Sequence, residues 1–242
     1  LVITFAIMIM FWGGGALISQ IFDITVNNIF LRIMHLIGGF SPTIASYISL
    51  KRSNKVKNFK EWLKEIFDIK HNIWTYALVI LFVLIYYVLG CAINGYEMGA
   101  PIFMLIIILP MMLFGGGNEE VGWRMILQPE LEKNFGFNIA TLFTAIIWWL
   151  WHLPIFFIKG TANVNMNYFL FGIMCLTLCY ALATIRKVSK GVFPCILLHC
   201  LINGLSAIFV FNYSPLSCVI SLIVTILVSM LILNINKRYI RE

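Results

Sequence analysis

Long apolar runs separated by short polar segments make up almost the whole chain. Eight such runs follow one another, and each has about 20 residues, enough for a helix to cross a hydrocarbon core of about 30 Å. We expect these helices at residues 1–21, 31–50, 72–93, 101–128, 137–157, 167–185, 192–211 and 215–235. The pattern predicts an all-α polytopic membrane protein with about eight transmembrane helices in a single domain, residues 1–242.

One polar segment, residues 56–70, has a helical periodicity of its own. Its apolar side chains recur three and four residues apart, at Val56, Phe59, Trp62, Leu63, Ile66 and Phe67. Lysines lie between them, so the segment predicts a basic amphipathic helix on the inner leaflet of the membrane.

The composition is typical of a membrane protein. Hydrophobic residues make up 61% of the chain and charged residues only 11%, which is far from the balance of a soluble globular domain. The net charge of +7 comes with no basic soluble domain, so we expect the lipid bilayer as a partner and no nucleic acid.

Basic residues gather in three short segments. Residues 51–70 hold seven Lys and Arg against three acids, and further basic groups lie at residues 186–190 and 236–242. Basic loops mark the cytoplasmic side of a membrane, and an even number of expected spans separates neighbouring segments. We therefore expect an integral protein of the plasma membrane with both termini in the cytoplasm.

The six cysteines lie in or beside apolar runs. They are Cys91, Cys175, Cys179, Cys195, Cys200 and Cys218. Their spacing matches no zinc motif such as paired CxxC units, so we interpret them as small packing residues.

A few ionisable and amide side chains fall inside the expected spans. An ionisable group at membrane depth costs at least ~2.5 kcal/mol on insertion scales, so such groups are usually paired or functional. The fourth span carries Glu119, Glu120 and Arg124, the fifth carries His152, and the seventh carries His199 and Asn203. We interpret His35 and His71 as structural, and Trp148, Trp149 and Trp151 as packing residues or cavity wall.

The two adjacent glutamates predict two different roles. On a helix, residues four apart share a face, so Glu120 can pair with Arg124. Glu119 points about 100° away from Glu120 and cannot easily join that pair. Three glycines at residues 115–117 allow a kink or the close approach of another backbone.

The expected depths bring the polar side chains to one level. At 1.5 Å per residue, Glu119 lies roughly 18 Å and His152 roughly 22 Å from the inner ends of their spans. His199 and Asn203 share a face and lie roughly 12 to 18 Å deep. We expect an intramembrane cavity that opens to the cytoplasm and holds these groups. Two alternatives stay open: each histidine alone also fits a structural role, and Glu119, Glu120 and Arg124 also fit a buried structural ion pair.

The motifs resemble those of a known family. EEVGWR at residues 119–124, WxxxH ending at His152 and HxxxN ending at Asn203 are similar to the EExxxR, FxxxH and HxxxN motifs of the CAAX prenyl protease and bacteriocin-processing family of intramembrane proteases. The resemblance covers residues 101–211. Trp148 departs from the family pattern, which usually has Phe four residues before the histidine.

The resemblance implies peptide-bond hydrolysis and assigns a role to each residue. Glu119 with His152 would activate water, His199 and Asn203 would donate hydrogen bonds to the oxyanion, and Glu120 with Arg124 would orient the helix. The implied substrate is a membrane-associated protein or peptide precursor, with a prenylated CAAX-type protein as one alternative.

Other chemistries and functions stay open at this stage. Glu119, His152 and His199 would be the ligands of a zinc ion, but HExxH is absent and an Asn is a poor zinc ligand, so we favour hydrolysis without a cofactor. A non-catalytic bacteriocin immunity or scaffold protein is the alternative from another class. A transporter fits less well because we find no inverted repeat.

Overall fold

The chain is almost entirely helical in the computed structural model, which describes residues 1–239. In that part of the chain the β-structure is one short antiparallel pair, β1 (Glu97–Met98) with β2 (Phe209–Val210). The predicted all-α class is therefore confirmed. The last three residues of the basic segment 236–242 lie outside the described residues.

Five helical segments are long and apolar enough to cross a membrane by length and composition. They are Val2–Ile21, Ile73–Asn94, Gly117–Phe157, Tyr168–Ser189 and Pro215–Asn236. The bent pair α3 (Ile29–Gly39) and α4 (Ser41–Arg52), with an angle of 44° between its parts, gives a sixth if it counts as one span. The expected count of eight is not confirmed within the described residues.

The first span contains an irregularity of its own. It consists of α1 (Val2–Met8), the π-helical turn η1 (Ile9–Gly13) and α2 (Gly14–Ile21). Trp12 in the π-helical turn is buried, and its indole N–H donates to the main-chain oxygen of His35 on α3 at 2.7 Å. This bond and the stacking of Trp12 on His35 join the first two helices.

The fourth expected span is not one helix. The short turn η2 (Ile102–Met104) leads into α7 (Leu105–Met111), and helical structure begins again only at Gly117. Gly116 between them has φ +139°, a value that residues with a Cβ rarely adopt. The expectation of a continuous helix over residues 101–128 is wrong because the backbone turns at the glycines, and Glu119 lies at the start of a helix.

The longest helical segment runs from Gly117 to Phe157 through several changes of helix type. It comprises η3 (Gly117–Glu119), α8 (Glu120–Gly122), the π-helix η4 (Trp123–Leu127), α9 (Gln128–Trp151) and η5 (Leu153–Phe157). Gly136, with φ +71°, interrupts α9 with a kink. This kink lies where the sequence predicts the boundary between the fourth and fifth spans.

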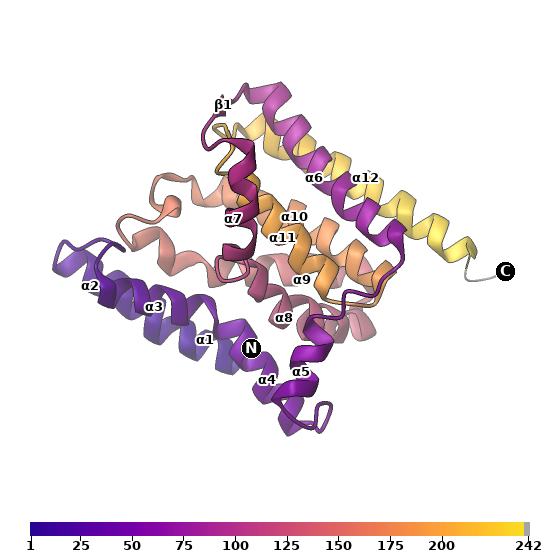
Figure 1. Cartoon of the computed structure of the whole chain (residues 1–242), viewed down its shortest axis with the longest axis horizontal. Coiled ribbons are helices and arrows are strands. Elements are labelled where there is room, and N and C mark those ends of the chain that lie inside the picture. The colour runs from indigo at the N-terminus through magenta and orange to yellow at the C-terminus, as the bar shows by residue number, and fades with distance from the viewer. Residues whose placement is uncertain (240–242) are drawn as a thin grey trace.

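The remaining elements enclose α11 (Phe193–Leu205), a helix too short to count as a span. Figure 1 shows α6 (Ile73–Asn94) and α12 (Pro215–Tyr239) side by side along one edge, with α10 (Tyr168–Ser189) and α11 near the centre. The turn η6 (Ala162–Asn165) precedes α10. α10 packs against both α9 and α12, so the elements that carry the predicted site lie in the interior of the bundle.

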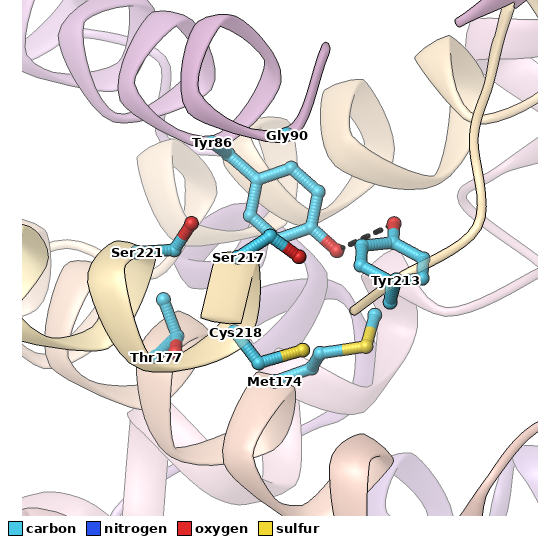
Figure 2. A pocket seen from close by; sticks show the side chains of 8 residues that line it. All are labelled: Tyr86, Gly90, Met174, Thr177, Tyr213, Ser217, Cys218 and Ser221. Atoms are coloured by element: carbon cyan, nitrogen blue, oxygen red, sulfur yellow. Dashed lines mark hydrogen bonds between the residues drawn. The ribbon is translucent and has the colours of Figure 1, made fainter. Parts of the chain in front are cut away.

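α12 packs against α10 through a line of small polar residues. Ser217, Ser221, Thr225 and Ser229 follow one another at four-residue spacing, and all are buried. Small side chains allow transmembrane helices to approach closely. Figure 2 shows the cavity of about 10 Å³ at the start of this line, where the hydroxyls of Tyr86 and Tyr213 lie 2.9 Å apart. A cavity of this volume is about the smallest that can hold one water molecule.

The amphipathic segment also forms a helix, α5 (Phe59–Ile66), shorter than the expected 56–70. The side chain of Asn58 caps it by accepting a hydrogen bond from the main-chain N–H of Glu61 at 2.9 Å. Trp62 and Ile66 are buried in an apolar cluster with Leu50 of α4, so one face of α5 packs onto the protein.

Candidate active site

Glu119 and Glu120 lie where the chain enters the bundle again after its glycine turn. η3 ends at Glu119 and α8 begins at Glu120, so the two side chains leave the backbone in different directions. The hydroxyl of Thr43 on α4 donates to the main-chain oxygen of Asn118 at 2.7 Å and holds this turn in place. The two carboxylates therefore have different partners.

Glu120 lies in a fully buried group of charged side chains. Its Oε2 lies 3.3 Å from Nε of Arg124, which is the ion pair predicted from their spacing, and neither side chain is exposed. Its Oε1 lies 2.7 Å from Nδ1 of His199 on α11. Arg124 in turn donates from Nη2 to the sulfur of Cys179 on α10 at 2.9 Å. These contacts join three helical segments around one balanced charge cluster.

Glu119 contacts a second set of residues at the end of α9. Its Oε2 accepts a hydrogen bond of 2.7 Å from the indole N–H of Trp148 and lies 3.9 Å from Nε2 of His152. Nδ1 of His152 lies 2.7 Å from the main-chain oxygen of Trp148. A carbonyl oxygen only accepts, so Nδ1 donates and the neutral ring has an unprotonated Nε2 on the side of Glu119.

Exposure separates the two carboxylates further. Glu120 is fully buried, whereas Glu119 and His152 each keep 7% of their surface exposed. Aromatic rings surround His152, with Trp148, Trp151 and Phe171 in edge contacts whose centroids lie 5.4, 4.7 and 5.0 Å away. Glu119 and His152 thus combine close spacing with a small remaining exposure.

His199 and Asn203 lie one turn apart on α11 and meet the glycine turn. Asn203 donates from Nδ2 to the main-chain oxygen of Gly115 at 3.0 Å. A Cβ at Gly116 would lie 2.4 Å from Nδ2 of Asn203 and 2.8 Å from Nε2 of His199. Only glycine lets the backbone pass this close to the two side chains.

The structure thus brings together side chains that are far apart in sequence, and it adds partners that the sequence did not reveal. Trp148 and Cys179, which we interpreted as packing residues, hydrogen-bond to Glu119 and Arg124. In the sequence, the sign that Trp148 has a partner of its own was its replacement of the Phe that the family usually has at this position. His35 stays apart from the set, and its Nδ1 has no hydrogen-bond partner among the described residues.

A zinc ion is the alternative use of the same side chains. The described residues contain no group of three His, Cys, Asp or Glu side chains arranged to hold one. Nδ1 of each site histidine is engaged, in His152 by a carbonyl oxygen and in His199 by Glu120. This leaves Nε2 as the free nitrogen of each ring, which is also the arrangement of a metal-bound histidine. We derive no step through a metal, and hydrolysis without one stays a proposal.

A separate polar pocket of about 640 Å³ lies near the basic loops. It is lined by the ends of several elements, including Lys55, Glu65, Met125, Arg186 and Lys190. Burial, and after it the charge of Glu61, raises the pKa of the Glu65 carboxyl. The six predicted site residues do not line this pocket, although Met125 and Ile126 directly follow Arg124.

Two comparisons with known proteins point to one family. Residues 101–205 match the family model described as Type II CAAX prenyl endopeptidase Rce1-like. The chain is also 25% identical over 225 residues to CAAX prenyl protease 2 of Methanococcus maripaludis, covering 83% of this chain and 80% of the relative. All six predicted site residues lie within the matched segment, and the resemblance that we drew from the motifs is confirmed.

Proposed function

From the premise that the chain is a protease of the Rce1-like CAAX endopeptidase family, we propose that Glu119 and His152 activate the water that cleaves its substrate inside the membrane. The observation that supports this most directly is the distance of 3.9 Å between Oε2 of Glu119 and Nε2 of His152. Both atoms are hydrogen-bond acceptors, and a gap of this length suits a bridging water that donates to each.

In this mechanism the two acceptors act together as the general base. The water bound between them loses one proton as its oxygen attacks the scissile carbonyl carbon. The same proton is then available to the leaving amine, so the base pair also acts as the general acid. The aromatic rings around His152 exclude other water from the reaction.

The tetrahedral intermediate needs donors for its oxyanion, and His199 and Asn203 are the proposed donors. Asn203 has an amide N–H besides the one that Gly115 accepts. Nδ1 of His199 donates to Glu120, so donation from Nε2 as well requires a doubly protonated ring. The two carboxylates, Glu119 and Glu120, together balance the charges of that ring and of Arg124.

We propose that the reaction needs no metal ion, because the acidic and basic groups can perform every proton transfer. The test is cleavage by the purified protein with and without a chelator, together with its metal content. Unchanged kcat in metal-free protein is the expected result. Loss of activity on chelation, with recovery on adding zinc, would contradict this part of the proposal.

The proposed substrate is a membrane-associated protein or peptide precursor. The relative is named a CAAX prenyl protease, which makes a peptide with a prenylated CAAX-type C terminus the first substrate to try. We further propose that the protein lies in the plasma membrane with the basic loops and both termini in the cytoplasm, on the charge of the loops alone. Five spans, unlike six, would leave the two termini on opposite sides of the membrane. Substrate would then enter from the inner leaflet.

The test uses purified protein in liposomes with a farnesylated CAAX peptide and the same peptide without the lipid. We expect kcat for Glu119→Ala and for His152→Ala to fall by about 10² to 10⁴, the usual contribution of general acid–base catalysis. Full activity in either variant would refute the assigned roles. If the wild type cleaves neither peptide, membrane peptides from cells with wild type or Glu119→Ala will reveal another substrate class.

A further inference from the structure

Trp148 contacts both halves of the proposed catalytic site. It lies on α9 one turn before His152, and only 3% of its surface is exposed. Its indole N–H donates to Oε2 of Glu119 at 2.7 Å. The edge contacts of its ring reach His152 and His199, with centroid distances of 5.4 and 5.5 Å.

The face of the same ring meets the buried cation of the site. The guanidinium carbon of Arg124 lies 5.4 Å from the centroid of the Trp148 ring, within the range of a cation–π interaction. Arg124 therefore interacts with the ring and with Glu120, while Glu119 receives its hydrogen bond from a neutral donor.

We propose that Trp148 is a positioning residue for the general base, an inference that rests on the proposed function. A Glu side chain has several rotamers, and a buried charge-assisted hydrogen bond selects one of them. Because the indole is neutral, it fixes the Glu119 carboxylate without cancelling the negative charge that attracts a proton from water. The hydrogen bond holds Oε2, the same oxygen that lies 3.9 Å from Nε2 of His152 on the side of the proposed water.

The neighbouring tryptophans show what a purely structural indole does in this helix. The indole N–H of Trp149 donates to the main-chain oxygen of Tyr168 at 2.9 Å, and its ring stacks on that tyrosine. The indole N–H of Trp151 donates to the hydroxyl of Ser41 at 3.0 Å. Neither donates to a carboxylate, so Trp149 provides a matched control for the loss of one N–H donor.

The kinetic test compares Trp148→Phe with Trp149→Phe in the peptide-cleavage assay. Phe keeps an aromatic ring but has no N–H, so we expect kcat of Trp148→Phe to fall about 10- to 100-fold, the range that follows from hydrogen bonds to charged groups. KM and Tm should stay close to those of Trp149→Phe, which should keep wild-type kcat. Wild-type kcat in Trp148→Phe would overturn the inference. So would a loss of kcat that comes with similar changes in KM and in Tm.

A second measurement does not depend on activity. In protein labelled with ¹⁵N-tryptophan, the indole resonance that disappears in Trp148→Phe identifies Trp148. We expect this resonance to shift in Glu119→Gln, because the charged acceptor is replaced by a neutral one, while the resonance of Trp149 stays in place. An unmoved Trp148 resonance would overturn the inference. Inactive wild-type protein would instead refute the proposed function.

Discussion

Two adjacent carboxylates inside the bundle have different partners. Glu120 has no exposed surface and is paired with Arg124 and His199, so its charge is balanced inside the bundle. Glu119 keeps some exposure, and its nearest polar partners are an indole and an imidazole. A buried and paired carboxylate stabilises structure, whereas a partly exposed carboxylate without a cationic partner is suited to act as a base.

Gly116 allows a direct test of the site geometry at this scale. In Gly116→Ala the new Cβ would collide with Asn203 and His199, so we expect kcat to fall by about 10² or more, the cost of a misplacement near 1 Å. Gly136→Ala is the control, because Gly136 also has a positive φ but no atom within 4 Å of its would-be Cβ. It should lose about 1 to 3 kcal/mol of stability, the cost of this backbone conformation for a residue with a Cβ, at unchanged kcat.

Equal loss of activity in the two alanine variants would contradict this interpretation, since it would assign the effect to backbone strain alone.

The contacts of single residues also show the limit of sequence reasoning. The pairing of Glu120 with Arg124 followed from helical spacing, because both lie on one short segment. The bonds of Glu119 to Trp148 and of Glu120 to His199 join segments 29 and 79 residues apart, and spacing says nothing about such contacts.

At the scale of the element, a break in regular helix positions the site. In the π-helix η4 the main-chain N–H of Gln128 bonds to the oxygen of Trp123, five residues earlier. The next bond of that register would lead from residue 129 to Arg124, but Pro129 has no N–H. Nε of Arg186 on α10 donates to the oxygen of Arg124 instead, at 2.9 Å. A side chain of another helix thus completes the hydrogen bonding of η4.

We expect Arg186→Ala to destabilise the protein by about 1 to 3 kcal/mol, the cost of an unsatisfied buried polar group. Lys187→Ala is the matched control, because Lys187 is half-exposed and pairs with the half-buried Glu132 rather than with the backbone of η4. The control should change stability by less than about 1 kcal/mol. Thermal unfolding in detergent measures both, and equal Tm values for the two variants would show that Arg186 does not support η4.

The sequence also explains which elements were hard to predict. The short helix α5 followed from its periodicity, because apolar residues at helical spacing pack one face onto the protein. The break between α7 and η3 did not follow, because the apolar run continues across it and only the glycines at 115–117 mark the turn. The kinked segment after Gly117 was predicted as two spans because residues near Gly136 are polar.

At the scale of the whole molecule, the bilayer determines most of what the sequence reveals. Apolar runs of spanning length predicted a polytopic helical membrane protein. The described residues confirm that class, with five helices long and apolar enough to span, or six with the bent pair. The count of eight was not reached because length and hydropathy do not separate a spanning helix from a short interior helix such as α11. Interior helices are apolar for the sake of packing.

The orientation remains a prediction, and thiol labelling tests it. Two single-cysteine substitutions, Lys60→Cys and Val164→Cys, provide the labelling sites. Lys60 lies on α5 beside the basic loops, Val164 lies in η6 beyond the end of α9, and both positions are exposed. In intact cells a membrane-impermeant maleimide should label Val164→Cys, and it should label Lys60→Cys only after the membrane is opened. The unsubstituted chain is the control, because its six thiols are buried or half-buried.

The central claim is that Glu119 and His152 act on one water molecule as a unit. The most direct test measures kcat for Glu119→Gln, His152→Ala and the double variant in the same peptide assay. Groups that act as a unit lose their effect together, so the double variant should be no slower than the slower single variant. If the fold-loss of kcat in the double variant equals the product of the two single losses, the claim is contradicted. Full activity in Glu119→Gln would also contradict it.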